Sequence, residues 1–72
     1  MSIEEKMNEI ADILEVDRNE ISEEMDLNEF DTWDSVAVLS VIALMNNKFD
    51  KYPHASEFKD LKTISDLINF MN

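Results

Sequence analysis

Apolar residues recur at helical spacing in three stretches of this chain, and loop signals separate the stretches. The first is predicted to form a helix from about Ser2 to Glu15, because Ser2 followed three residues later by Glu5 is a capping-box pattern. Its apolar positions lie three or four residues apart: Ile3, Met7, Ile10, Ala11 and Leu14. This spacing predicts that one face of the helix packs against the rest of the molecule.

The second stretch is the longest apolar helical pattern in the chain. Asp34 is a good N-cap, and Ser35 to Asn47 follow without glycine or proline, so a helix is predicted there. Apolar residues cover nearly its whole circumference: Val36, Val38, Leu39, Val41, Ile42, Ala43, Leu44 and Met45. A helix with one buried face needs only an apolar stripe. This helix is therefore either buried from several sides or left partly exposed for a partner.

The third stretch follows a proline break, because proline cannot continue a helix. A short helix is predicted from Ser56 to Leu61, with Phe58 and Leu61 facing inward. Thr63 and Asp66 then form a capping arrangement, with aspartate in place of the usual glutamate, at the start of a last amphipathic helix. The apolar face of that helix comprises Ile64, Leu67, Ile68 and Met71.

Between the first two predicted helices, residues 16 to 33 mix acids and asparagines with isolated apolar side chains. We predict a long ordered loop here, with one helical turn near Ser22 to Met25. The side chains that would hold it against the core are Val16, Ile21, Met25, Leu27, Phe30 and Trp33. Since no strand pattern is present, the predicted fold class is all-α, a small four-helix bundle of three principal helices and one short helix in a single domain, residues 1–72.

Charge is distributed very unevenly along the chain. Residues 1–34 hold thirteen of the seventeen acids and only two bases, whereas residues 35–72 hold four of each, and the net charge is −11. Such a field repels nucleic acid and anionic membrane and would speed the approach of a basic protein surface. The acids could equally serve only to keep a small domain soluble. There is no cysteine, no apolar h-region and no run long enough for a membrane span, so we expect a cytoplasmic protein without membrane insertion.

The residue types needed for most catalytic and metal sites are missing. A 72-residue chain has little room for a deep active site, and the single histidine, His54, has no cysteine or second histidine as a partner. No EF-hand loop and no glycine-rich phosphate loop is present. The four lysines of the second half are expected to form a solvated face: Lys48, Lys51, Lys59 and Lys62. We therefore expect no catalytic residues and no metal site.

One serine hydroxyl stands where a covalently attached phosphate is best tolerated. Ser35 is at a predicted helix N-terminus, where unpaired backbone N–H groups and the positive end of the helix dipole favour an anion. Taken alone, Asp34-Ser35 is an ordinary helix start. Together with the apolar helix that runs to Phe49 and the start of the last helix at Thr63-Ile64-Ser65-Asp66-Leu67, however, Asp34-Ser35-Val36 resembles the attachment motif of acyl carrier proteins.

This resemblance covers almost the entire chain and implies a non-enzymatic carrier. Ser35 would bear 4'-phosphopantetheine, transferred from coenzyme A by a phosphopantetheinyl transferase, and Asp34 would complete the motif. The thiol of this cofactor would hold an acyl or aminoacyl group as a thioester. The implied partners are acyl- or aminoacyl-loading and acyl-processing enzymes, as in fatty acid or polyketide biosynthesis, and the carrier would be a free-standing monomer.

Departures from the family pattern carry further information. Fatty-acid carriers usually have glycine where this chain has Thr32 and leucine where it has Val36. Their second helix displays acids that basic partners contact, whereas the matching positions here are Ala37, Ser40, Asn46, Asn47 and Lys48. This favours a dedicated carrier of a specialised pathway whose partners dock by apolar contact. The predicted partner surface comprises Val36, Ala37, Leu39, Ser40 and Ala43.

Two alternatives stay open. Pro53 with Ser56-Glu57-Phe58 is loosely similar to D-alanyl carrier proteins, so a D-alanyl or peptidyl carrier is one. The other belongs to a different class of protein, an acidic and non-enzymatic interaction module. Its acidic first half would mimic nucleic acid or cap a basic partner.

Overall fold

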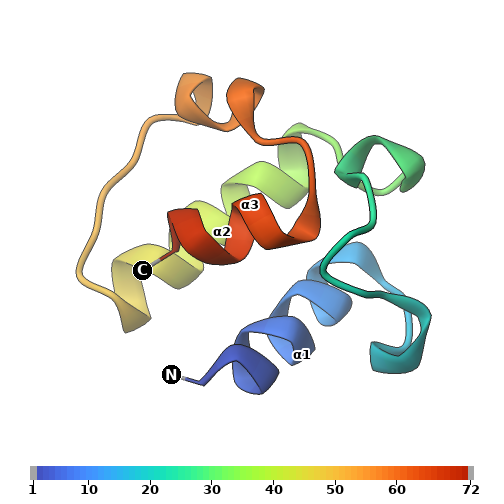
Figure 1. Cartoon of the computed structure of the whole chain (residues 1–72). Coiled ribbons are helices and arrows are strands. Elements are labelled where there is room, and N and C mark those ends of the chain that lie inside the picture. Colours follow the sequence, from blue (N-terminus) through green and yellow to red (C-terminus); the bar gives the residue numbers. More distant parts are fainter. Residues whose placement is uncertain (1, 72) are drawn as a thin grey trace.

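Three α-helices and three short 3-10 helices make up residues 2–71, which are the residues that the computed structural model describes (Figure 1). The α-helices are α1 (Ile3–Leu14), α2 (Ser35–Lys48) and α3 (Ile64–Phe70); the 3-10 helices are η1 (Arg18–Glu20), η2 (Leu27–Glu29) and η3 (Ala55–Asp60). The described residues contain no strand, only one isolated antiparallel bridge between Asp26 and Thr63. The all-α prediction, with three principal helices and a short one before the last, is confirmed.

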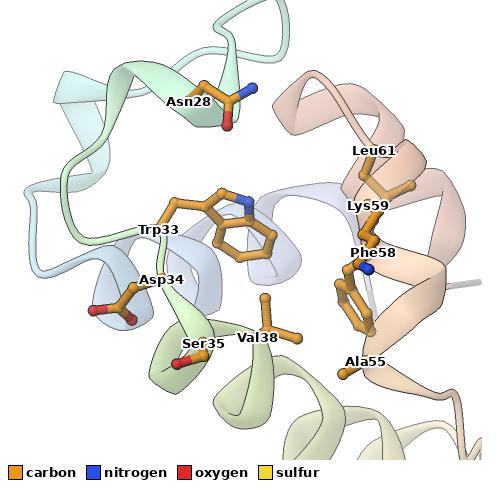
Figure 2. Close-up of a pocket in the computed structure, with 9 residues that line it drawn as sticks. All are labelled: Asn28, Trp33, Asp34, Ser35, Val38, Ala55, Phe58, Lys59 and Leu61. Atoms are coloured by element: carbon orange, nitrogen blue, oxygen red, sulfur yellow. The ribbon is translucent and has the colours of Figure 1, made fainter.

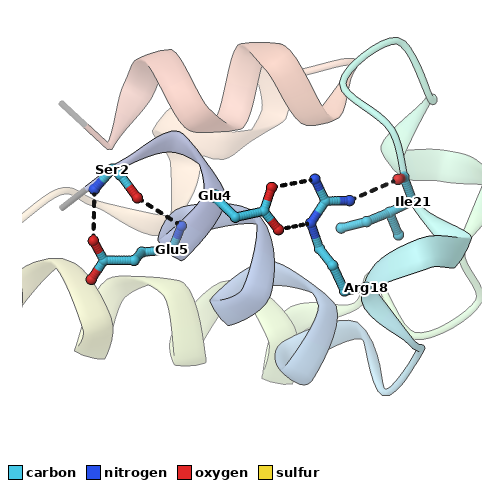
Figure 3. A network of polar contacts seen from close by, with 5 residues as sticks. All are labelled: Ser2, Glu4, Glu5, Arg18 and Ile21. Atoms are coloured by element: carbon cyan, nitrogen blue, oxygen red, sulfur yellow. Dashed lines mark hydrogen bonds and ion pairs between the residues drawn. The ribbon is translucent and has the colours of Figure 1, made fainter.

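Helix α1 begins at the predicted capping box. The Ser2 hydroxyl accepts from the Glu5 N–H at 3.1 Å, and the Glu5 carboxylate accepts from the Ser2 N–H at 3.2 Å (Figure 3). The helix ends at Glu15, which adopts the left-handed conformation with φ 60°. The apolar face is buried as predicted, except that Ile3 is 55% exposed because it lies in the first turn, beyond the edge of the core.

The acidic segment after α1 is tied back to that helix by its one arginine. Arg18 donates to both carboxylate oxygens of Glu4, at 2.6 and 2.9 Å, and to the Ile21 carbonyl at 3.2 Å (Figure 3). These hydrogen bonds lower the pKa of Glu4. Since Glu4 is exposed, the pair adds little to stability, but it fixes the course of the chain from α1 into the loop.

The segment from residue 16 to residue 34 is an ordered loop, as predicted, but its internal structure differs from the expectation. The Met25 N–H donates to the Ser22 carbonyl in the predicted turn, while η1 and η2 were not predicted. Backbone bonds join this loop to the start of α3: Leu27 N–H to Lys62 C=O at 2.8 Å, Ile64 N–H to Met25 C=O at 2.9 Å, and Ser65 N–H to Glu23 C=O at 2.8 Å. These long-range bonds explain why a segment so rich in acids is ordered.

The core lies between the three α-helices and is closed by the loop. Leu14, Leu27, Val41, Ile64, Leu67 and Met71 are fully buried. Phe58 of η3 is also buried, whereas Leu61, predicted to face inward too, is only half-buried. One buried residue was missed by the sequence reading: Lys6 is 4% exposed, with its ammonium 5.6 Å from the centre of the Phe49 ring.

Helix α3 starts at the second capping box. The Thr63 hydroxyl accepts from the Asp66 N–H, and the Asp66 carboxylate accepts from the N–H groups of Lys62 and Thr63, each at 3.1 Å. The pKa of Asp66 is lowered because these backbone N–H groups stabilise its charged form. Asp66 therefore completes the capping box in place of the usual glutamate, as predicted.

This capping carboxylate predicts a specific pH dependence. A carboxyl whose pKa is lower in the folded chain stabilises the fold above its unfolded pKa, about 3.9, and this contribution is lost as pH falls through the folded pKa. We expect the difference in thermal midpoint between the wild-type chain and Asp66→Asn to shrink from pH 6 to pH 3. The control is Asp60→Asn, an exposed acid of η3 that removes the same charge. An equal pH trend for both variants would contradict the assignment.

Candidate functional site

The start of α2 presents Ser35 to solvent. Asp34 is the N-cap, and its carboxylate accepts from the Ala37 N–H at 3.0 Å, while its carbonyl accepts from Val38 N–H at 3.0 Å. Both Asp34 and Ser35 are exposed. Because the first N–H groups of a helix have no partner within it, a negative group on the Ser35 hydroxyl would lie at the positive end of a 14-residue helix.

Hydrogen bonds fix the residues just before Ser35 to the end of α1 and to the preceding loop. Thr32 donates its hydroxyl to the Leu14 carbonyl at 2.7 Å, so it caps the C-terminal end of α1. The Asp34 N–H donates to the Thr32 carbonyl at 3.0 Å, and the Trp33 N–H donates to the Phe30 carbonyl at 3.0 Å. Thr32, which departs from the family pattern, therefore links α1 to the entry of α2.

A pocket of about 320 Å³ lies on one side of this helix start (Figure 2). Its walls come from three segments: the loop before α2, the first turn of α2, and η3 with the residue that follows it. The lining residues are Asn28, Trp33, Asp34, Ser35, Val38, Ala55, Phe58, Lys59 and Leu61. Figure 2 shows the Trp33 ring turned into this space, with Ser35 at its edge. We call it the Trp33 pocket.

A second pocket, of about 300 Å³, lies between α1 and the start of α2, and it is acidic. Three of its lining residues are carboxylates, Glu15, Asp31 and Asp34, and no basic residue lines it. The others are Ile13, Thr32, Val36, Ala37 and Ser40. We call it the acidic pocket. The start of α2 therefore lies between the Trp33 pocket, which has Lys59 and Asp34 among its lining residues, and the acidic pocket, which has Asp34, Glu15 and Asp31 and no base.

Helix α2 is not buried from all sides, because part of its apolar surface is exposed. Val36 and Leu39 are 67% and 60% exposed, and Ser40 and Ala43 are also on the surface. The prediction that Ala37 belongs to this surface is corrected: it is only 4% exposed, because it packs beneath the Asp34 cap. Four of the five predicted partner-surface residues are therefore accessible.

The site has the features of an attachment point. An exposed primary hydroxyl, a helix N-terminus and an adjacent pocket together fit a group joined to Ser35 through a phosphodiester. His54, the one histidine, is exposed as the N-cap of η3 and is not among the lining residues of either pocket. Residues 2–71 contain no cluster of three or more side chains arranged to hold a metal ion.

Comparison with known families decides what kind of protein this is. The family model described as a phosphopantetheine attachment site matches residues 7–71. The chain belongs to this family. Its members carry covalently attached 4'-phosphopantetheine, so the protein is a phosphopantetheine carrier. No curated protein and no solved structure matches the chain significantly.

Family membership also defines the coarse role of the carrier. Carrier domains of this kind are generally non-catalytic and interact with the enzymes that modify and process them. No helix within the described part of the chain is long and apolar enough to cross a membrane. The sequence did not predict the two pockets, the place of Asn28 and Lys59 in the Trp33 pocket, or the bond from Thr32 to Leu14, because these depend on contacts between segments far apart in the chain.

Proposed function

We propose that Ser35 is the attachment residue and that residues 1–72 form a single carrier domain. The observation that carries this proposal is the exposed Ser35 hydroxyl at the N-terminus of α2, within the segment that matches the family. The hydroxyls of Ser2 and Ser40 have other roles, since Ser2 caps α1 and Ser40 donates to the Val36 carbonyl at 3.1 Å. The proposed carrier is a monomeric cytoplasmic protein.

The residues around Ser35 position the group and do no chemistry on it. When bound, phosphopantetheine supplies a thiol that holds an acyl or aminoacyl group as a thioester. Asp34 holds the first turn of α2 in place through its bond to the Ala37 N–H. The free N–H groups of that turn would stabilise the phosphate, and Thr32 keeps the helix start against α1.

Partner enzymes are proposed to dock on the exposed face of α2. Val36, Leu39, Ser40 and Ala43 form an apolar surface one to two turns long that begins beside Ser35. The carboxylates of the acidic pocket border this surface and favour a partner with a basic rim. The partners are a phosphopantetheinyl transferase and the enzymes that load and process the cargo of a specialised acyl pathway. A D-alanyl or peptidyl carrier uses the same surface with another cargo.

Intact mass after enzymatic modification tests the attachment residue. The chain is incubated with coenzyme A and a broad-specificity phosphopantetheinyl transferase, and we expect a mass gain of one phosphopantetheine group. Ser35→Ala is expected to show no gain, while Ser40→Ala, a serine of the same helix, should be modified like the wild-type chain. A gain that persists in Ser35→Ala would refute the proposal. No gain in any variant would favour the acidic interaction module.

A further inference from the structure

We infer that Thr32 is a positioning residue for the attachment reaction. Its hydroxyl fixes the segment before Ser35 to the end of α1, so that a phosphopantetheinyl transferase binds this segment in a conformation that is already formed. This inference rests on the proposed attachment at Ser35. It goes further, because it assigns the side chain that holds Ser35 in place and the kinetic constant that depends on it.

The Thr32 hydroxyl bonds to a carbonyl that helix α1 cannot satisfy by itself. Leu14 is the last residue of α1, and the last carbonyl groups of a helix have no N–H partner within it. The Thr32 hydroxyl donates to this carbonyl at 2.7 Å, from a position that is partly shielded from water. Since the Leu14 side chain is fully buried, the bond anchors Thr32 to a fixed point of the core.

Further hydrogen bonds connect Thr32 to the first turn of α2. The Asp34 N–H donates to the Thr32 carbonyl at 3.0 Å, and the Asp34 carboxylate accepts from the Ala37 N–H at 3.0 Å. Ser35 lies between the two ends of this second bond. The position of Ser35 relative to the core is therefore set by a series of bonds that begins at the end of α1.

The backbone at position 32 does not require glycine, which fatty-acid carriers usually have there. Within residues 2–71, the non-glycine residues with positive φ are Glu15 and Asp50, so Thr32 has an ordinary negative φ. Glycine would give this segment more conformations, whereas the β-branched threonine restricts it and adds the bond to α1. A partner that binds a restricted segment loses less free energy in ordering it.

The initial rate of mass gain with a phosphopantetheinyl transferase tests the role of Thr32. Thr32→Val keeps the shape of the side chain and loses the hydroxyl. We expect it to raise the KM for the carrier about fivefold, the change typical of one lost hydrogen bond, because fewer molecules would have the binding conformation. The kcat should stay within about twofold of the wild-type value, since Thr32 acts only through the backbone. Thr32→Ser, which keeps the hydroxyl, should restore the wild-type KM.

Ser2→Ala is the matched control for stability. It removes the cap at the opposite end of α1, so it should lower the thermal midpoint about as much as Thr32→Val while leaving KM unchanged. An equal rise of KM in Ser2→Ala, or a wild-type KM in Thr32→Val, would overturn the inference. So would a lower kcat with unchanged KM in Thr32→Val. A wild-type chain that gains no mass would instead refute the attachment itself, and the role of Thr32 with it.

Discussion

Replacing Leu27 by alanine is expected to destabilise the protein by about 2 to 5 kcal/mol, a large part of the stability of a domain of this size. Leu27 lies in the loop before α2, yet it is fully buried, and its N–H donates to the Lys62 carbonyl. Truncating its side chain would leave a cavity between the loop and the helices. The prediction therefore tests whether this acidic segment is part of the core. The measurement is chemical denaturation of the wild-type chain and the variant.

The control uses the same substitution at an exposed leucine. Leu39→Ala, on a side chain that is 60% exposed, should change the free energy of unfolding by no more than about 0.5 kcal/mol. Similar losses of unfolding free energy in both variants would mean that Leu39 is buried, for example against a second copy of the chain. A negligible loss for Leu27→Ala would mean that the loop is not packed as described.

The same Leu39→Ala variant is expected to lower the kcat/KM of phosphopantetheinyl transfer about tenfold, which corresponds to about 1.4 kcal/mol of lost transition-state binding. Leu39 lies one turn beyond Ser35 on a helix face without charges, so an enzyme acting on Ser35 would cover it. The measurement is the initial rate of mass gain as a function of carrier concentration.

Tyr52→Ala supplies the matched control for this second prediction. Tyr52 is 70% exposed, so it is as accessible as Leu39, but it lies in the segment after α2 and lines neither of the two pockets beside Ser35. Its variant should be modified at the wild-type rate. A tenfold loss in both variants, or in neither, would show that the face with Val36 and Leu39 is not the specific docking surface.

The helix starts could be predicted from the sequence because they depend on local chemistry. Ser2 with Glu5, and Thr63 with Asp66, each satisfy backbone N–H groups of their own first turn. The bonds between the loop and the start of α3 could not be predicted, because they join residues at least 35 positions apart. Lys6 was missed for a related reason: burial of its stem beside Phe49 depends on how α1 meets the end of α2.

The candidate site was predictable in part. The position of Ser35 followed from Asp34 and the apolar helix after it, since an N-cap marks the first turn. Which face of α2 is exposed could not be predicted, because apolar residues around the whole helix do not indicate which side is buried. The prediction that Ala37 is accessible is wrong for that reason, since its side chain is only 4% exposed. The Trp33 pocket forms where three separate segments of the chain meet, and no sequence pattern predicts such a meeting.

Attachment of phosphopantetheine to Ser35 in the natural protein can be measured directly. The most direct measurement is mass spectrometry of the protein isolated from its native cell, followed by fragmentation of the peptide that contains Ser35. We expect a population in which one phosphopantetheine group is attached to Ser35. A protein that is uniformly unmodified, or modified on another serine such as Ser40, would contradict it.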